Sequence, residues 1–488
     1  MIKFYLSNFL VSTIISISIF ILIGNQACDD SFIHYRVAEN LALHGKPFFS
    51  LADPVNISSS PIWTLILALI YLLPGNTYFW LIIFNSLIIS AVTCIWCALS
   101  ETSDFSSYWL AFALSLLMIQ TSVTDQMETP FAGLFFFASL LLLKRQRYYL
   151  CVMSAMSLGF IRPELIILSL ILLICIIQQC SNFRAVILVG ILFFNILFIV
   201  IFNIFGSVIP HSIYVKSIIY DIESSQTFLD LLSGRDDWPL IIRLMPYFSL
   251  FYVVRLNIWS RICALFIILL SSAYIIKHTF IFSWYVCLIH WPLAFIAFNA
   301  AIKNRKALLI IVLFNVPFIY DLYLNCNSKH RYELRSARVK TYLYLSSILS
   351  RYSDESTKLL VAEIGAISYQ FKGTIIDGAG LASPRALQFH PMVVPDQRVH
   401  GSVAAIPKKL FDESKPDILL AYDLFLTDVA KSQYLKNYHI VNLPLFAKPW
   451  INILNQNETF WSSKNLKLLI NKKFKSHAEL MRDLKEKY

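Results

Sequence analysis

Hydrophobic residues gather in long blocks that alternate with short polar segments along this chain. Residues 1–24 contain one charged side chain, Lys3, and residues 185–208 contain none. An apolar run of roughly 18 residues or more is what an α-helix needs to cross a hydrocarbon layer of ~30 Å. One or two such runs could be anchors, whereas about a dozen predict a bundle of membrane-spanning helices.

The apolar blocks define a series of candidate spans. Several are shorter than about 17 residues, so some must be kinked, paired or incompletely spanning. The candidates are 5–24, 61–73, 78–99, 107–120, 129–143, 148–161, 164–180, 185–206, 241–254, 262–276, 279–300 and 306–323. The first run is longer than the ~7–15 residues of a signal-peptide core, so we interpret it as a retained span.

Basic residues in short loops predict the orientation of these spans. They alternate along the chain and are expected on the cytoplasmic side, at Lys144–Arg147, Arg184, Arg255 with Arg261, and 303–306. The outer face then holds Asp125–Thr129, Arg162–Glu164, 206–239 and everything after about 324. Twelve full spans with a cytoplasmic N-terminus would leave the C-terminus inside. We therefore expect one segment between 61 and 121 to cross incompletely, which gives about eleven spans.

The character of the sequence changes at Asn325. Charged residues become frequent, no long apolar run remains, and short β-type runs alternate with helical stretches such as 331–349. The β-type runs are 359–361, 374–376, 418–421 and 439–441. This pattern predicts a small α/β domain, followed by a basic, helical tail at 464–488. The predicted fold is a polytopic α-helical membrane module over 1–324 with an extracytoplasmic α/β domain over 325–488.

Composition agrees with a membrane protein. Hydrophobic residues make up 57% of the 488 positions and charged residues 15%, and the mean hydropathy is +0.63. In soluble domains, apolar residues average roughly 45–50% and charged residues about 25%. A net charge of +11 would suggest nucleic acid for a soluble protein. Here the basic residues lie in inter-span turns and the last third of the chain, so we expect a lipid bilayer and no nucleic acid as partner.

Two adjacent carboxylates, Asp29 and Asp30, follow the first span. Their mutual repulsion can raise the pKa of one while the other stays ionised. The pair could serve as a general base or hold a divalent cation, the one cofactor that we consider. Tyr35 and Arg36 follow with helical spacing, which is typical of a helix lying along the membrane surface. The alternative is that the two acids only stabilise the start of that helix.

Three further polar clusters are expected on the outer face. Glu128 precedes a span, where an acidic residue can also act as a helix cap. Arg162-Pro163-Glu164 places an arginine at the interface, where its planar fork suits a phosphate ligand, although an ion-paired arginine is equally compatible. The segment 206–216 carries His211, Tyr214 and Lys216 in a loop, where such residues are often only solvated.

Taken in order, these clusters resemble the motifs of the GT-C glycosyltransferases, and most closely their arabinofuranosyltransferase-like branch. The stretch from Asp29 to Leu41 and then Ser60-Pro61-Ile62-Trp63-Thr64 resembles the family's opening motifs. Further similar segments follow in the family's order, at Met127-Glu128-Thr129, Arg162-Pro163-Glu164, Pro210–Lys216, Glu363–Ala366 and Asp377–Leu381. The sequence departs from the family's pattern at His211, which replaces the usual Asn, and at Glu363, which replaces Asp.

The resemblance implies that a sugar moves from a polyprenyl-phosphate donor to an acceptor hydroxyl of a cell-envelope glycan, lipid (such as lipopolysaccharide) or protein. Reaction is implied at the outer, periplasmic face of a bacterial inner membrane. Asp29 or Asp30 would be the base, with Asp29 preferred and Asp30 orienting it. Arg162, His211 and Lys216 would contact the donor phosphate, and Glu128 would orient substrate hydroxyls. Tyr35, Arg36, Glu164 and Tyr214 complete the predicted substrate-binding set.

Two other classes of membrane protein remain as alternatives. An O-antigen ligase-like enzyme is expected to carry a large outer loop between late spans, whereas the longest loop of this chain, 206–239, lies mid-chain. A transporter or flippase of envelope glycolipids is expected to show inverted repeats and charges in mid-membrane. This chain keeps its charges at the ends of the spans.

Overall fold

The chain forms two compact units in a computed structural model. The structure describes residues 2–23, 27–51, 54–124, 126–219, 245–279, 281–304, 329–390, 406–443 and 465–487, together with positions 228, 231 and 392. The first unit consists of 1–26, 59–203 and 222–324, and the second of 27–58, 204–221 and 325–488. The segments 27–58 and 204–221 thus belong with the C-terminal residues, whereas the predicted domain boundary grouped them with the spans.

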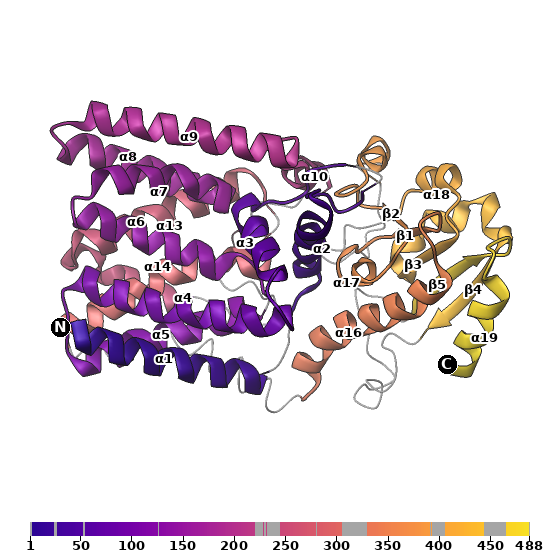
Figure 1. The fold of residues 1–488 in the computed structure, drawn as a ribbon, viewed down its shortest axis with the longest axis horizontal. Helices are drawn as coiled ribbons and strands as arrows, with labels where there is room; N and C mark the ends of the chain where they lie inside the picture. The colour runs from indigo at the N-terminus through magenta and orange to yellow at the C-terminus, as the bar shows by residue number, and fades with distance from the viewer. Residues whose placement is uncertain are drawn as a thin grey trace. The chain divides into compact units, whose positions relative to one another are not determined.

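The first unit is a bundle of helices that lie side by side (Figure 1). Its elements are α1 (Ile2–Ile23), α3 (Pro61–Tyr71), α4 (Thr77–Ser100), α5 (Phe105–Thr124), α6 (Thr129–Lys144), α7 (Tyr148–Ile161), η1 (Pro163–Leu165), α8 (Ile166–Gln179), α9 (Phe183–Phe205), η2 (Met245–Arg255), α13 (Ile258–Ile276) and α14 (Ser283–Lys303). Within the described residues, five helices are long and apolar enough to cross a membrane, namely α1, α4, α9, α13 and α14.

The predicted spans correspond closely to these helices. Residues 148–161 match α7 in full, while 241–254 correspond to η2, which is a 3₁₀-helix. The last candidate span, 306–323, lies outside the described residues. Helix α3 has 11 residues, and at 1.5 Å per residue it extends about 16 Å, half of the hydrocarbon thickness. This length is compatible with the incomplete crossing expected between 61 and 121, and the number of spans stays a prediction.

Each end of this bundle carries an ion pair or cluster of its own. Lys144, at the end of α6, donates to the carbonyl oxygens of Ala98 and Leu99 at 2.9 Å each and pairs with Glu101 at 2.8 Å. Because consecutive helices alternate in direction (Figure 1), the start of α6, the end of α7 and the start of α8 meet at the other end. That end carries the Arg162 cluster described below.

The bundle interior is packed with aromatic rings. Trp96 is fully buried and contacts Phe137 and Phe295 at centroid distances of 5.3 and 5.7 Å. Gly133 allows Trp291 to approach, because a Cβ at this glycine would lie 3.1 Å from the indole ring. Such close-packed aromatic contacts contribute beyond the area that they bury.

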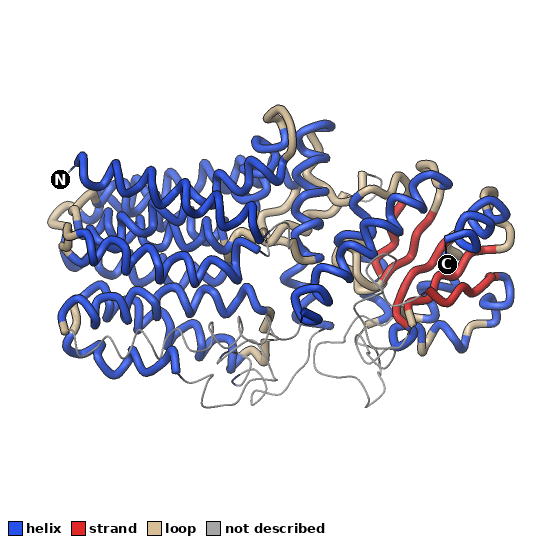
Figure 2. Tube along the Cα trace, turned by 90° about the horizontal axis from the view of Figure 1, so that it is seen from below, coloured by secondary structure: helices blue, strands red, loops and turns tan. Residues whose placement is uncertain are grey.

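The second unit is built around a five-stranded sheet. Its strands are β1 (Lys358–Val361), β2 (Thr374–Asp377), β3 (Ile418–Tyr422), β4 (Tyr438–Leu443) and β5 (Leu466–Asn471). Their spatial order is β2-β1-β3-β5-β4. Strand β1 pairs in parallel with β2 and β3, and β5 pairs antiparallel with β3 and β4. Figure 2 shows the five strands side by side with helices alongside them.

Helices and short 3₁₀ turns complete the second unit. They are α2 (Asp29–His44), α10 (His211–Ile219), α16 (Lys329–Tyr352), α17 (Gly365–Tyr369), η4 (Pro384–Phe389), α18 (Lys408–Ser414), η5 (Asp423–Leu426), η6 (Val429–Lys431), η7 (Gln433–Asn437) and α19 (His477–Lys487). The expected α/β character of the C-terminal region is present, and the four predicted β-type runs correspond to β1–β4.

The prediction for the tail was wrong in its first half. Residues 464–488 were expected to be helical, but Leu466–Asn471 form β5, which lies between β3 and β4. Leu466, Leu468, Leu469 and Ile470 are buried there. Lysines around this strand led to the prediction of a solvated basic helix. In the structure the helix begins only at His477.

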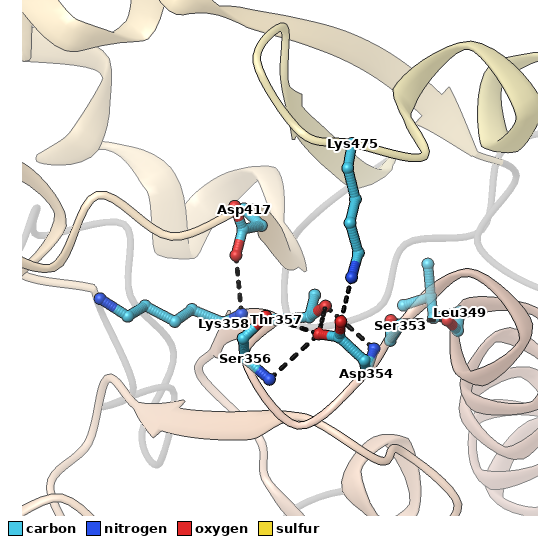
Figure 3. A network of polar contacts seen from close by, with 8 residues as sticks. All are labelled: Leu349, Ser353, Asp354, Ser356, Thr357, Lys358, Asp417 and Lys475. Atoms are coloured by element: carbon cyan, nitrogen blue, oxygen red, sulfur yellow. Dashed lines mark hydrogen bonds and ion pairs between the residues drawn. The ribbon is translucent and has the colours of Figure 1, made fainter.

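Polar contacts link the loops at one end of strands β1, β3 and β5 (Figure 3). The Asp354 carboxylate, in the turn between α16 and β1, accepts hydrogen bonds from the Ser356 backbone N–H at 3.0 Å and the Thr357 hydroxyl at 3.1 Å. It also pairs with Lys475, which follows β5. The Lys358 backbone N–H donates to Asp417 at 2.9 Å. These contacts hold the start of β1 against its neighbours.

Candidate functional site

The two aspartates at the start of α2 have different surroundings. The Asp29 side chain is buried, and its two carboxylate oxygens accept hydrogen bonds from the backbone N–H groups of Ala366 at 2.8 Å and Gly365 at 3.1 Å. Cys28 occupies the N-cap position of α2 and makes no side-chain capping hydrogen bond. The Asp29 carboxylate thus binds the corner between β1 and α17 instead of capping its own helix.

A glycine makes this close approach feasible. A Cβ at Gly365 would lie 2.6 Å from the carboxyl carbon of Asp29 and closer still to its carbonyl oxygen. Any larger residue would push the backbone of α17 away from α2. The glycine in the Glu363–Ala366 segment is therefore required by the packing against Asp29.

Glu363, two residues before that glycine, is held by two side chains of α16. One of its carboxylate oxygens pairs with Arg338, and the other accepts a hydrogen bond of 2.7 Å from the Tyr342 hydroxyl. Arg338 and Tyr342 lie four residues apart and so on one face of the helix. Tyr342 also lies 6.3 Å, ring to ring, from the buried Tyr422 of β3.

The electrostatics of this cluster follow from burial and from the balance of charges. Burial, reinforced by Glu363, raises the pKa of Asp29 above its ordinary value, while Arg338 and the two backbone N–H groups oppose the rise. Burial alone would lower the pKa of Arg338, but Glu363 and Asp29 outweigh it and hold that pKa above its ordinary value. Arg338 thus stays cationic between two carboxylates.

Asp30 differs from Asp29 in its access to solvent. Its side chain is half-buried, and within the described part of the chain no hydrogen bond to its carboxylate is found. Burial raises the pKa of Asp30, while Lys216 of α10 opposes the rise and Asp29 adds to it. A half-buried carboxylate with a raised pKa is suited to accept a proton from a substrate hydroxyl.

Helix α10 carries three of the predicted site residues into the second unit. The backbone N–H of His211 donates to the carbonyl oxygen of Asn56 at 2.7 Å. Val215 and Ile219 pack on Ala379 in the turn after β2. Tyr214 is mostly exposed and lies 6.2 Å, ring to ring, from His211. Lys216 follows on the same helix, near enough to affect Asp30.

Tyr35 and Arg36 fasten α2 to its surroundings. The Arg36 guanidinium donates to the carbonyl oxygens of Phe49, at 2.9 Å, and of Ser368, and it lies 5.1 Å above the Phe49 ring. Burial lowers the pKa of Arg36 to about 10. The buried Tyr35 ring contacts Phe32 edge-on at 5.5 Å. This geometry favours a structural role for both side chains, and their predicted contact with substrate stays a prediction.

Glu128, Arg162 and Glu164 come together in the first unit. The Arg162 guanidinium pairs with Glu128 at 2.6 Å and with Glu164 at 2.7 Å. It lies 4.9 Å above the ring of Tyr285, and the Tyr274 hydroxyl donates to Glu164 at 3.2 Å. Arg162 and Glu128 are almost completely buried. The cluster joins the ends of α6, α7, α13 and α14, and the role of Arg162 toward a donor phosphate stays a prediction.

The arrangement of these acidic side chains does not suit a metal ion. Among the described residues, no group of three or more His, Cys, Asp or Glu side chains is placed to hold a metal ion. Asp29 directs its two oxygens at backbone N–H groups, so the pair does not present a ready ligand set for the divalent cation considered above.

Sequence reasoning missed Arg338 and Tyr342. The only signal was their spacing of four residues on a predicted helix, which is common and points to no partner. Their role becomes visible once the fold places that helix beside the corner that contains Glu363.

Comparison with known proteins adds one match. Residues 329–463 match a family model described as a domain of unknown function (DUF8728). The matched segment contains Arg338, Tyr342 and the Glu363–Ala366 corner, and it excludes Asp29, which that corner holds. A search of curated proteins found no match to the chain.

Proposed function

We propose that this protein is a membrane glycosyltransferase of the GT-C type that moves a sugar from a polyprenyl-phosphate donor to a cell-envelope acceptor. One observation carries the proposal. Segments that resemble successive motifs of that family, although hundreds of residues apart, lie together in the second unit around Asp29 and Asp30. They are the start of α2, the α10 segment with Lys216, the Glu363–Ala366 corner and the turn after β2.

Within this proposal Asp30 is the catalytic base, in place of the Asp29 that the family resemblance favours, because both carboxylate oxygens of Asp29 already accept backbone hydrogen bonds. Its half-buried carboxylate takes the proton of the acceptor hydroxyl, whose oxygen bonds to the anomeric carbon of the donor sugar. The bond between that carbon and the phosphate oxygen breaks, and polyprenyl phosphate leaves with the bonding electrons. We assign Lys216, whose positive charge opposes the rise in the pKa of Asp30, to stabilise the negative charge that grows on the departing phosphate. In-line attack of this kind inverts the anomeric centre.

The proposed location is the periplasmic face of a bacterial inner membrane. Apolar helices long enough to cross a membrane support embedding in a bilayer. Basic side chains at one end of the bundle, such as Lys144, favour a cytoplasmic location for that end by the positive-inside rule. The Arg162 end would then face outward, together with the segments that follow α1 and α9.

The proposal is tested with the full-length protein reconstituted in lipid and supplied with polyprenyl-phosphate sugars and envelope glycolipid acceptors. Transfer is measured for the native protein, Asp30→Asn and Asp29→Asn. We expect Asp30→Asn to lower kcat by about 10³-fold or more, since general-base catalysis contributes typically 10²–10⁴-fold, and Asp29→Asn to lower it less. Transfer that survives Asp30→Asn at the native rate would contradict the assignment of the base.

The same preparation tests the alternative classes of protein. A flippase would move a fluorescent polyprenyl-phosphate sugar across the vesicle bilayer without forming product. A ligase-like enzyme would use a diphosphate-linked glycan in preference to the monophosphate donor. Either result would replace the proposed function.

A further inference from the structure

Contacts from the C-terminal residues reach the Asp29–Asp30 pair through a short series of groups. Glu363 is paired with Arg338 and accepts a hydrogen bond of 2.7 Å from Tyr342. Immediately after Glu363 and Ile364 come the two backbone N–H groups that hold the Asp29 carboxylate, at 3.1 and 2.8 Å. The position of Asp29 therefore depends on a corner that two side chains of α16 fix in place.

The attachment leaves no room for adjustment at its centre. A Cβ at Gly365 would overlap the Asp29 backbone and lie 2.6 Å from its carboxyl carbon. Contacts this close cannot be relieved by rotating a flexible side chain, because the backbone of Asp29 itself is in the way. The short distance between α2 and α17 therefore requires that residue 365 has no side chain.

A second attachment lies two turns further along α2. The Arg36 guanidinium donates to the carbonyl oxygens of Ser368, at the end of α17, and of Phe371, at 3.3 Å for the latter. The Phe32 ring contacts the Tyr369 ring at 5.3 Å. Two attachments on one helix fix its rotation as well as its position, so they also fix the direction in which Asp30 points.

We infer that residues 338–371 of the C-terminal region position the Asp29–Asp30 pair, with Glu363 and Gly365 as the positioning residues and Asp29 as the group that they hold. The effect on sugar transfer rests on the proposed function, whereas the attachment does not. The segment that matches the domain of unknown function contains every C-terminal member of this attachment. We assign this matched segment the role of positioning Asp29 and Asp30, which lie outside it.

The attachment is tested first without any reaction. Amide hydrogen exchange of peptides covering 363–371 is compared in the full-length protein and its Asp29→Asn and Asp30→Asn variants. Asp29→Asn replaces a charged acceptor of two N–H groups, so we expect exchange at Gly365 and Ala366 to become about tenfold faster. Asp30→Asn is the matched control and should leave exchange unchanged. Equal exchange in the native protein and in Asp29→Asn would overturn the inference.

The effect on transfer is tested with two equally crowded glycines. Gly365→Ala introduces a Cβ against Asp29, while Gly373→Ala introduces one 2.2 Å from the Thr357 carbonyl oxygen and 2.9 Å from the Asp354 carbonyl oxygen, inside the sheet domain. We expect Gly365→Ala to lower kcat about 100-fold, with little change in KM and a displaced acidic limb of the pH profile, because small misplacements of reacting groups cost about this much. Gly373→Ala should lower thermal stability and leave the pH profile in place. Parallel losses in both variants would overturn the inference.

Glu363→Gln provides a second variant in case Gly365→Ala does not fold. It keeps the shape of the side chain and removes the charge that pairs with Arg338, so we expect a lower kcat and the same displaced pH limb. Native kinetics in Glu363→Gln would contradict a positioning role for Glu363. If the exchange results hold and no polyprenyl-phosphate donor is used, the proposed function fails while the attachment stands.

Discussion

The Asp29 carboxylate accepts a hydrogen bond of 2.8 Å from the backbone N–H of Ala366, 337 positions further along the chain. The contact separates the two aspartates by role. Asp29 is buried and bonded through two oxygens to one corner of the C-terminal domain, while Asp30 is half-buried and feels the charge of Lys216. Each residue therefore makes a different prediction for stability.

Asp29→Ala is expected to destabilise the second unit, and Asp30→Ala is not. Removing the Asp29 side chain leaves the buried N–H groups of Gly365 and Ala366 without their acceptor, at a cost of about 2 kcal/mol in the free energy of unfolding. Asp30→Ala should stay within about 0.5 kcal/mol, as substitutions away from such contacts usually do. Thermal unfolding of the full-length protein in detergent measures the difference. Equal unfolding temperatures would show that the hydrogen bonds to Asp29 contribute nothing to stability.

The Arg162 cluster predicts a large loss of stability for Arg162→Ala. The variant leaves the buried Glu128 and the half-buried Glu164 without their cation, and breaking a buried pair in this way costs roughly 3–5 kcal/mol. Arg162→Lys should recover part of the loss, because a lysine keeps the charge but cannot bond both carboxylates with one planar group. Arg184→Ala is the control, since Arg184 is exposed at the other end of the bundle. Folded yield and unfolding temperature are the measurements; a stable Arg162→Ala that fails only to bind donor would favour a phosphate ligand.

Much of the helical unit was predictable because the bilayer restricts what a sequence can do. An apolar run inside a bilayer must be helical so that its backbone groups are hydrogen-bonded. Runs such as 148–161 therefore predict both the helix and the residues at which it begins and ends. Loop charges likewise led us to expect an incomplete crossing between 61 and 121, and α3, with 11 residues, is short enough to be one. These are local properties, which a single sequence displays directly.

The contacts that assemble the site were not predictable in the same way. Periodicity reports which face of a helix is apolar, but it says nothing about a partner 337 positions away. Strand β5 was missed for a related reason, since its lysines are local features while its burial between β3 and β4 is a property of the fold. For Arg162 the sequence left an ion pair and a phosphate ligand equally open, and the structure supplies two carboxylates to pair with it.

Hydroxyl groups between α1, α4 and α5 predict a second contribution to the stability of the bundle. Ser90 accepts hydrogen bonds from Ser12 at 2.8 Å and from Thr13 at 2.9 Å, and Ser12 also bonds to Tyr108 at 3.0 Å. Bonds of this kind between membrane helices contribute about 0.6 kcal/mol each, so Ser90→Ala should cost about 1 kcal/mol. Ser18→Ala serves as the control, because the exposed Ser18 donates to the carbonyl oxygen of Ile14 in its own helix. Denaturant unfolding in mixed micelles gives both values, and equal costs would remove any special role for the cluster.

The buried Asp377 predicts a pH-dependent stability of the sheet domain. Burial raises its pKa to about 6, although backbone N–H groups such as those of Ala382 and Ala379 oppose the rise. Between about pH 4 and pH 6 the folded state therefore keeps a proton that the unfolded chain has released. Stability should fall as the pH rises through this window, by about 3 kcal/mol in total, and then level off.

Two variants isolate this effect. Asp377→Asn cannot ionise and should remove the slope between about pH 4 and pH 6. Asp354→Asn should keep it, because the Lys475 amine and neighbouring hydroxyls hold the pKa of Asp354 below its ordinary range and so below this window. Calorimetry of the full-length protein across the window measures the slope. A native protein whose stability is flat, or rises with pH there, would contradict the role of Asp377.

The predicted membrane topology can be tested by labelling one exposed position in each unit. Gln146, in the basic turn between α6 and α7, and Glu355, in the turn before β1, are both exposed. In a background without native cysteines, Glu355→Cys should react with a membrane-impermeant maleimide added outside intact cells, because the sheet domain is expected on the outer face. Gln146→Cys should react only after the cells are opened, because short loops rich in lysine and arginine stay in the cytoplasm. Reaction of both sites from outside would refute the charge-based topology, and reaction of neither would place the sheet domain in the cytoplasm, where it could not serve a periplasmic site.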